Sequence, residues 1–319
     1  MRCLCCGKEI RETAGSEEIK TGWHKKCVRS FFGVDRLPVL DITNDSLEHL
    51  AGLAVNKGLT VPGVQKKLSL HLSVEKETRL TIVDYPTGYI LKPQSESYIH
   101  LPEYEDLAMR QAKASGIDTV PHALLKLDGT YAYITKRIDR KVCGDNVEMY
   151  AMEDFCQLAG RMTQDKYRSS YESCGRIIKR FSKRPMLDLS ELFIRVLFFF
   201  LSGNSDMHLK NFSLIETEPG GREYVLSQAY DLLPVNLILQ EDEEELALSL
   251  NGKKKNIRRK DILQFAQSCE MTAGTAERII KKMCAMEKKW MELCDASYLS
   301  EDEKDAMKQL IKERIVRIS

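Results

Sequence analysis

An apolar run that leads straight into a dense polar loop constrains this chain more than any other stretch. Residues 192–201 (LFIRVLFFFL) are apolar at every position except Arg195. The run is well short of the roughly twenty residues needed to cross a bilayer, so we expect a buried helix. Residues 202–213 (SGNSDMHLKNFS) then bring four polar side chains within six positions: Asp206, His208, Lys210 and Asn211. Packing alone does not explain this density of charged and amide groups, which indicates a functional loop.

The spacing within this loop is typical of one reaction class, phosphoryl transfer. In kinase-type enzymes a loop Asp accepts the proton of the substrate hydroxyl, and an Asn four intervening residues later binds Mg²⁺. Asp206 and Asn211 have that spacing, and Asp231 follows twenty residues later, where a second metal ligand is expected. We expect Lys210 to neutralise charge that develops on the transferred phosphoryl group. His208 is better interpreted as orienting the loop through a hydrogen bond than as carrying a proton.

Residues upstream fit the same chemistry. Lys92 ends the β-prone run 88–92, and Glu105 lies in the acidic opening of an expected helix. Kinases hold the nucleotide phosphates with such a lysine, which is itself held by a helix carboxylate, so we pair Lys92 with Glu105. The stretch 59–70 predicts a loop entering a strand, with backbone amides available to phosphate at Gly63, Val64 and Gln65. By itself this loop is a weak signal, because it is neither a GxGxxG motif nor a P-loop.

Together these segments resemble the HipA family of bacterial toxin kinases. The resemblance extends from about residue 58 to the C-terminus, and the set is specific although each motif alone is weak. The matching stretches are TVPGVQKKLSL (60–70), GYILKP (88–93), LPEYEDLAMRQA (101–112), ITKRIDR (134–140), MEDFCQLAG (152–160), SGNSDMHLKNFS (202–213), AYDLLP (229–234) and LSLNGKKKNIRRKDIL (248–263). Tyr104 departs from the family pattern, which usually has Asn there.

The resemblance implies a two-lobed, protein-kinase-like fold of the α+β class, with a small β-rich lobe before a larger helical lobe. It implies ATP and Mg²⁺ as cofactors and phosphorylation of a protein hydroxyl. The implied roles are the catalytic base for Asp206, magnesium ligands for Asn211 and Asp231, the ATP-phosphate lysine for Lys92, and an adenine-binding hinge from Lys136 to Ile138.

The resemblance also implies partners. Full-length members carry a separate N-terminal subdomain ahead of the phosphate loop, where this chain has fewer than sixty residues. In shorter members a separately encoded small protein resembles that subdomain, and a helix-turn-helix antitoxin of the HipB type usually accompanies them. The chain would then be the toxin of a toxin–antitoxin system and would meet DNA only indirectly. Known members modify aminoacyl-tRNA synthetases, but nothing in this sequence selects a substrate.

A regulatory residue is implied at Thr60. Family members carry a serine in the phosphate loop whose autophosphorylation ejects the loop, and Thr60 occupies the corresponding position. A phosphate would add about two negative charges beside a site for ATP phosphates, so it would inhibit. The alternative is a hydroxyl that caps a turn.

The first 36 residues carry a different signature. Cys3 and Cys6 form one close pair, and His24 and Cys27 form a second after seventeen intervening residues. Two such pairs fit a tetrahedral Zn²⁺ site of the Cys3His type, with Cys5 as a spare thiol. A closed site of this kind serves stability or binding, whereas catalysis needs an open coordination position.

Composition sets the outer limits. The chain has 319 residues, 43% of them hydrophobic, with a net charge of +1 and a pI near 7.5. This balance does not favour direct binding to nucleic acid or membrane, and without an apolar leader we expect a cytoplasmic protein. The expected segments are a zinc-knuckle-like segment (1–36), a kinase N-lobe (37–138) and a helical C-lobe (139–319). Strands are expected at 67–72, 79–83, 89–92, 123–126 and 131–136.

Two charged runs and two other function classes complete the interpretation. The acidic run 241–245 predicts a solvated loop, and the basic run 253–260 is either solvated surface or a contact for an acidic partner. Alternatives to a protein kinase are a small-molecule phosphotransferase and a non-catalytic kinase-like module in a DNA-bound repressor complex. The second is disfavoured because a decayed kinase is free to lose members of a set that is complete here: Lys92, Asp206, Asn211 and Asp231.

Overall fold

The computed structural model describes residues 1–40, 67–73, 78–81, 87–143, 146–239 and 241–319. It forms two compact units: Met1–Asp106 with Val120–Glu148 (unit 1), and Leu107–Thr119 with Met149–Ser319 (unit 2). The helix α4 (Leu101–Ala114) contributes to both. Each unit is described by itself below. The predicted boundaries 1–36, 37–138 and 139–319 stay predictions.

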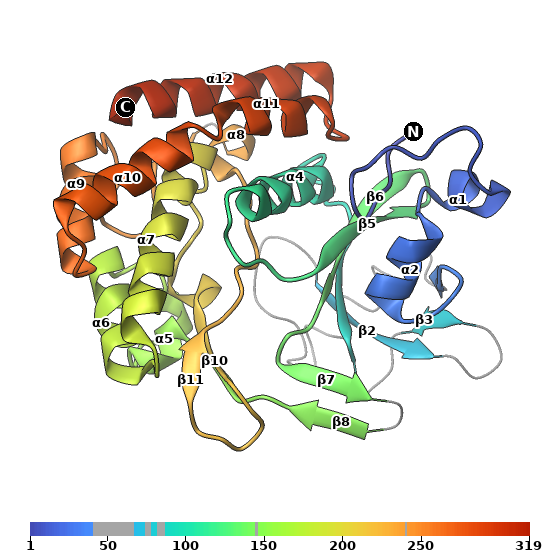
Figure 1. The fold of residues 1–319 in the computed structure, drawn as a ribbon, viewed down its shortest axis with the longest axis horizontal. Coiled ribbons are helices and arrows are strands. Elements are labelled where there is room, and N and C mark those ends of the chain that lie inside the picture. The colour runs from blue at the N-terminus through green and yellow to red at the C-terminus, as the bar shows by residue number, and fades with distance from the viewer. Residues whose placement is uncertain (41–66, 74–77, 82–86, 144–145, 240) are drawn as a thin grey trace. The chain divides into compact units, whose positions relative to one another are not determined.

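Unit 1 is built on a six-stranded sheet in the order β1-β3-β2-β4-β6-β5 (Figure 1). All its pairings are antiparallel except β1–β3. The strands are β1 (Val39–Leu40), β2 (Leu68–Ser73), β3 (Arg79–Thr81), β4 (Tyr89–Lys92), β5 (His122–Leu127) and β6 (Thr130–Lys136), and a separate pair is formed by β7 (Arg140–Cys143) and β8 (Asn146–Met149). All five strands expected from the sequence are present.

Local chemistry explains the hairpin and the helix ends of unit 1. β5 and β6 are joined by Asp128 and Gly129 with φ of 44° and 82°, the left-handed backbone that a tight two-residue hairpin needs, as predicted. The N-terminal helices α1 (Ser16–Thr21) and α2 (Lys25–Phe32) each end at a left-handed glycine, Gly22 and Gly33. The Lys136 ammonium on β6 donates to the Ser30 carbonyl of α2 at 3.4 Å, so α2 lies close to β6.

Unit 2 is mainly helical, with a three-stranded sheet in the order β11-β10-β9. Its elements are β9 (Met152–Asp154), α5 (Phe155–Leu158), η1 (Thr163–Asp165), α6 (Tyr171–Phe181), α7 (Pro185–Ser202), η2 (Leu209–Asn211), β10 (Ser213–Glu216), β11 (Tyr224–Leu226), α8 (Val235–Ile238), α9 (Arg259–Ser268), α10 (Ala273–Cys284), α11 (Glu287–Asp295) and α12 (Glu301–Ile318). The last helix begins at a capping box of Ser300 and Glu303, as the sequence predicts.

The central helix α7 is the buried helix expected from the apolar run. Pro185 starts it, the apolar side chains of the run 192–201 are buried except Ile194, and it packs against α6, α9, α10 and α12 (Figure 1). It ends at Gly203, whose φ of 73° and approach to Leu310 leave little room for a side chain. The polar loop that begins at Asn204 is therefore fixed at its start by a rigid helix. In the part of the chain that the structure describes, no helix is both long and apolar enough to span a membrane.

The acidic run 241–245 lies outside the helices and strands, as predicted for a loop, but the prediction that it is solvated is wrong at Glu245. Glu245 is buried, accepts a hydrogen bond from the Ile257 N–H at 2.9 Å and pairs with Arg317. The next acids pair with the basic run: Lys254–Glu244 and Lys255–Glu243, each at 3.0 Å. These two ion pairs form because the Asn251-Gly252 turn, with φ of 49° and 74°, brings the basic run back beside the acidic one.

Candidate active site and metal centre

The lysine and glutamate paired from the sequence form a buried ion pair in unit 1. Lys92 is the last residue of β4, and its Nζ lies 2.5 Å from Oε1 of Glu105 on α4. The two side chains are only 5% and 2% exposed. The ammonium also lies 5.2 Å from the ring centroid of Tyr133, its cross-strand neighbour on β6. The predicted pairing is confirmed, and the role of Lys92 toward ATP stays a prediction.

The predicted hinge, Lys136 to Ile138, begins at the last residue of β6. The backbone N–H of Lys136 donates to Pro121 O at 3.0 Å, and that of Arg137 donates to Gly88 O at 2.9 Å. Both amides therefore hold the sheet together. Contacts to an adenine ring fall to the backbone carbonyls and to Ile138, whose role stays a prediction. The Lys136 side chain is half-buried, and burial lowers the pKa of its ammonium.

The predicted catalytic loop in unit 2 is arranged around Asp206. The Asn211 side-chain amide donates from Nδ2 to the backbone carbonyl of Asp206 at 2.9 Å. This bond leaves the amide oxygen of Asn211 available, and oxygen is the ligand that Mg²⁺ prefers. The Asp206 carboxylate is 45% exposed, and Nε2 of His208 lies 3.9 Å from its Oδ1. The buried His208 thus lies next to the predicted base, as an orienting residue would.

Tyr167 is a neighbour of Asp206 that the sequence did not indicate. Its phenol donates to Oδ1 of Asp206 at 2.5 Å, and its ring lies 4.9 Å from that of His208, edge to face. Burial and the adjacent carboxylate raise the pKa of Tyr167, which keeps the phenol a donor. Its segment is bound to the loop twice more, through Leu209 N–H to Lys166 O at 3.2 Å and through the Tyr171 hydroxyl to Met207 O at 3.2 Å.

Lys210 has a specific partner that the sequence also did not indicate. Its Nζ lies 2.6 Å from Oδ2 of Asp154, which caps the N-terminus of α5 through Oδ1. The MED triplet of β9 was visible as a motif, but its partner depends on the pairing of β9 with β10. Any contact of Lys210 with a phosphoryl group therefore competes with an existing ion pair, and its catalytic role stays a prediction.

Asp231 has strained backbone and an anchored neighbour. Its φ is +60°, a region that costs a residue with a side chain and that recurs at functional sites. The preceding Tyr230 holds the segment in place, since its hydroxyl is 2.6 Å from the Ser213 hydroxyl and donates to Lys210 O at 3.3 Å. Asp231 is thus held at the segment that carries Asn211. Carboxylate and amide oxygens are donors that fit Mg²⁺, and the binding of Mg²⁺ by Asn211 and Asp231 stays a prediction.

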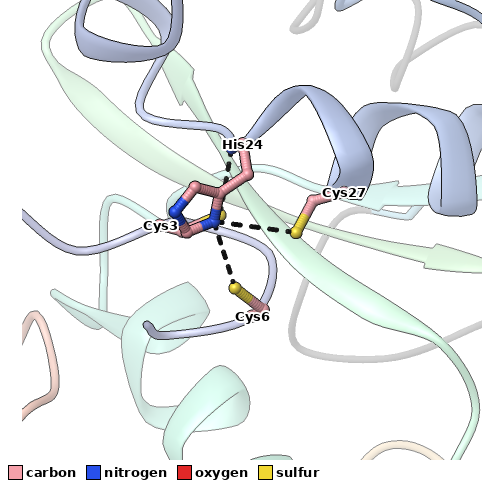
Figure 2. Close-up of side chains that lie close together, drawn as sticks. All are labelled: Cys3, Cys6, His24 and Cys27. Carbon is pink, nitrogen blue, oxygen red and sulfur yellow. Dashed lines mark hydrogen bonds between the residues drawn. The ribbon is translucent and has the colours of Figure 1, made fainter. Parts of the chain in front are cut away.

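The four residues of the predicted zinc motif converge in unit 1. Figure 2 shows three thiols and one imidazole turned toward one another, with their ligand atoms all within 4.8 Å. Nδ1 of His24 lies 3.4 Å from the sulfur of Cys6 and 3.9 Å from that of Cys27, and the His24 N–H donates to the Cys3 sulfur at 3.4 Å. Tetrahedral zinc with bonds of about 2.0–2.3 Å needs ligand atoms at such separations. The spare thiol Cys5 is not part of the cluster.

The second nitrogen of His24 supports a metal-binding tautomer. Nε2 lies 3.2 Å from the Glu9 carbonyl, so it carries the proton and leaves the Nδ1 lone pair for a metal. The thiols respond differently to their surroundings. Burial raises the pKa of Cys6, but hydrogen bonds, the largest of them from the Lys8 backbone N–H, outweigh it and lower the value to about 7. Burial and neighbouring sulfurs raise the pKa of Cys27.

The chain is similar in sequence to one protein family and to several kinases. The model of the family described as HipA-like C-terminal domain matches residues 59–290, well over half of the chain. The chain belongs to this family. "Putative kinase Y4mE" of Sinorhizobium fredii is 32% identical over 196 residues, covering 59% of this chain and 46% of that protein. "Serine/threonine-protein kinase toxin HipA" of Shewanella oneidensis is 29% identical over 212 residues, covering 61% and 47%. This HipA-like chain thus spans about half the length of these two relatives.

Solved structures show the same fold. Shewanella oneidensis HipA, determined with HipB and operator DNA, matches with a TM-score of 0.67 and 19% identity, over 85% of this chain and 70% of that one. The Helicobacter pylori proinflammatory kinase CtkA matches with a TM-score of 0.53 and 16% identity, over 79% and 93%. At these identities the likeness shows the fold alone, and it confirms the predicted α+β, kinase-like class.

One part of the predicted site lies outside the described residues. It comprises the phosphate-loop positions Gly63, Val64 and Gln65 and the predicted regulatory residue Thr60. The remaining site residues of this HipA-like chain fall in the two units: Lys92, Glu105, Lys136 and Ile138 in unit 1, and Asp206, His208, Lys210, Asn211 and Asp231 in unit 2.

Proposed function

We propose that this HipA-like chain is an ATP-dependent kinase that phosphorylates serine or threonine hydroxyls of a protein. The observation that carries the proposal is the arrangement of the 206–211 loop. The Asn211 amide is held on the Asp206 carbonyl while the Asp206 carboxylate remains partly exposed. A base and a metal ligand held by one hydrogen bond are what phosphoryl transfer to a hydroxyl requires.

The residues divide the reaction among them. Asp206 accepts the proton of the acceptor hydroxyl as its oxygen bonds to the γ-phosphorus and the bond to the leaving ADP oxygen breaks. Lys92, fixed by Glu105, binds the nucleotide phosphates. Asn211 and Asp231 would hold Mg²⁺, which would neutralise charge at the phosphates.

Intact-mass spectrometry tests this proposal directly. The wild-type chain and Asp206→Asn are incubated with Mg·ATP, alone and with a lysate depleted of nucleotides. The wild type is expected to gain phosphate or to transfer it to lysate proteins, and the variant is not, because Asn cannot accept the proton. ATP binding by the variant should persist. Turnover by Asp206→Asn, or transfer to metabolites only, contradicts the proposal, and the second result identifies a small-molecule phosphotransferase.

We propose Thr60 as a site of autophosphorylation that inhibits the kinase. The support is the position of Thr60 ahead of the backbone amides of the predicted phosphate loop. A phosphopeptide map of the ATP-treated chain should contain Thr60, and Thr60→Ala should remove that peptide. An unchanged map refutes the assignment.

We also propose a helix-turn-helix partner and a toxin role. Support comes from the solved complex of Shewanella HipA with HipB and operator DNA, which has the fold of this chain. A HipB-like protein from the same source should co-elute with the chain and should relieve growth arrest caused by its expression. If Asp206→Asn arrests growth as strongly as the wild type, the arrest does not come from phosphorylation.

The cysteine and histidine cluster is proposed to hold one structural Zn²⁺. Four protein ligands fill a tetrahedral site, so no coordination position is open for a substrate. Elemental analysis should give one equivalent per chain, which is lost in Cys3→Ser with Cys6→Ser. A well-folded chain without metal contradicts this proposal.

A further inference from the structure

The metal cluster is connected to the sheet of unit 1 through residues next to its ligands. Leu4 follows Cys3 and Trp23 precedes His24, and both are almost fully buried. The backbone N–H of Leu124 on β5 donates to Leu4 O at 3.1 Å, and the Trp23 indole N–H donates to Leu124 O at 3.1 Å. The backbone N–H and C=O of one residue of the edge strand β5 are thus both hydrogen-bonded to residues that adjoin metal ligands. A metal bound by Cys3 and His24 would hold Leu4 and Trp23 in place on Leu124. We call the hydrogen bonds of Leu4 and Trp23 with Leu124 the clamp.

The third thiol reaches the sheet by another path. Cys27 lies on α2, and Phe31 follows it one turn later on the same helix. The Phe31 ring lies 5.9 Å from that of Tyr89, whose hydroxyl donates to Phe31 O at 3.3 Å. Burial of that hydroxyl raises the pKa of Tyr89 to about 12, so it stays a donor.

These contacts end at the last residue of β6, where the predicted hinge begins. Tyr89 pairs with Lys136 in the sheet. The Lys136 ammonium donates to Ser30 O at 3.4 Å and lies 5.4 Å from the Phe31 ring centroid. The side chain of the first hinge residue is therefore held by the helix that carries a metal ligand.

Detached from the sheet, residues 1–36 are too few to hold a shape of their own. Below about forty residues a chain cannot bury enough apolar surface and usually needs a metal or a disulfide. Cys3, Cys5, Cys6 and Cys27 are not joined by disulfides, so cross-linking of this kind does not stabilise the segment.

We propose that metal binding at Cys3, Cys6, His24 and Cys27 controls nucleotide affinity by clamping β5 and by holding Lys136 at the start of the hinge. The nucleotide part of this inference rests on the proposed kinase function, and the clamp itself does not. Loss of the metal releases Leu4 and Trp23 from Leu124 and α2 from Tyr89. The sheet then loses its support on the hinge side while the Lys92–Glu105 pair stays in place.

Fluorescence isolates the clamp because the chain has two tryptophans, Trp23 and Trp290. In a Trp290→Phe background, emission reports Trp23 alone. Removing zinc with a chelator should shift this emission to the red as the buried indole enters water, and added zinc should reverse the shift. Cys5→Ser is the matched control, a neighbouring thiol outside the cluster, and should retain zinc and emission. An unshifted spectrum after complete loss of zinc overturns the clamp.

Calorimetry of ADP binding isolates the coupling to the hinge. Zinc-loaded wild type and Cys5→Ser should bind ADP alike, and chelator-treated wild type should bind at least about tenfold more weakly until zinc is restored. Trp23→Phe keeps every ligand but removes the indole N–H together with part of the buried ring, so it should keep zinc and lose affinity severalfold. Equal affinity with and without zinc overturns the coupling. If the zinc-loaded wild type binds no ADP, the proposed function fails instead, while the Trp23 emission still decides the clamp.

Discussion

Replacing Glu105 with Gln tests the energetics of the buried ion pair in unit 1. The substitution keeps the shape of the side chain but leaves the Lys92 ammonium, 5% exposed, beside a neutral amide. Breaking one side of a buried pair costs about 3–5 kcal/mol, because the remaining charge loses its partner without regaining water. The Gln oxygen still accepts a hydrogen bond and the Tyr133 ring still faces the ammonium, so we expect the lower end, about 3 kcal/mol. That loss lowers the unfolding temperature by about 6–12 °C.

Thermal and denaturant unfolding of Glu105→Gln measure this loss of stability. Two further variants serve as controls. Lys92→Met with Glu105→Leu removes both charges and should recover most of the stability, because neither charge is then left buried alone. Glu148→Gln breaks an exposed pair of unit 1, with Lys141 at 3.6 Å, and should cost less than about 1 kcal/mol. If Glu105→Gln is no more costly than Glu148→Gln, the ion pair is not buried in solution and the reasoning is refuted.

Three other substitutions probe unit 2. Tyr167→Phe removes the hydrogen bond to the predicted base and should lower kcat about tenfold with little change in KM for ATP. The control Tyr171→Phe removes a hydroxyl from the same segment and should lower stability but not kcat. Equal losses of kcat in the two variants would show that the Tyr167 effect is only structural. Asn211→Ala should raise the Mg²⁺ concentration needed for half-maximal rate, and an unchanged Mg²⁺ dependence contradicts the ligand assignment. Asp154→Asn frees Lys210, so phosphoryl transfer should not fall if Lys210 acts on the phosphate; a large fall shows that the ion pair itself is required.

Local chemistry made much of the fold predictable. The strands of unit 1 follow β-prone runs, the hairpin at Asp128 and Gly129 follows from residues that tolerate positive φ, and the box at Ser300 starts the last helix. Glu245 of the acidic run was misjudged as solvated because its burial depends on partners from distant segments, Ile257 and Arg317.

Some contacts of the candidate site could also be predicted from the sequence, and others could not. The pairing of Lys92 with Glu105 and the convergence of the metal motif could be predicted, because both rest on spacings that the chemistry itself imposes. Tyr167 was missed because it lies 39 residues from Asp206, and no motif marks it.

The sequence by itself determined which chemical groups this chain carries, in which order, and which family it joins. Only the tertiary structure decided which groups touch. The bond from Trp23 to Leu124 spans 101 positions, and that from Lys210 to Asp154 spans 56. Such contacts depend on how strands pair and helices pack, which fixes the path of the chain, and side-chain direction then selects the partner. Residue type and spacing do not contain that information.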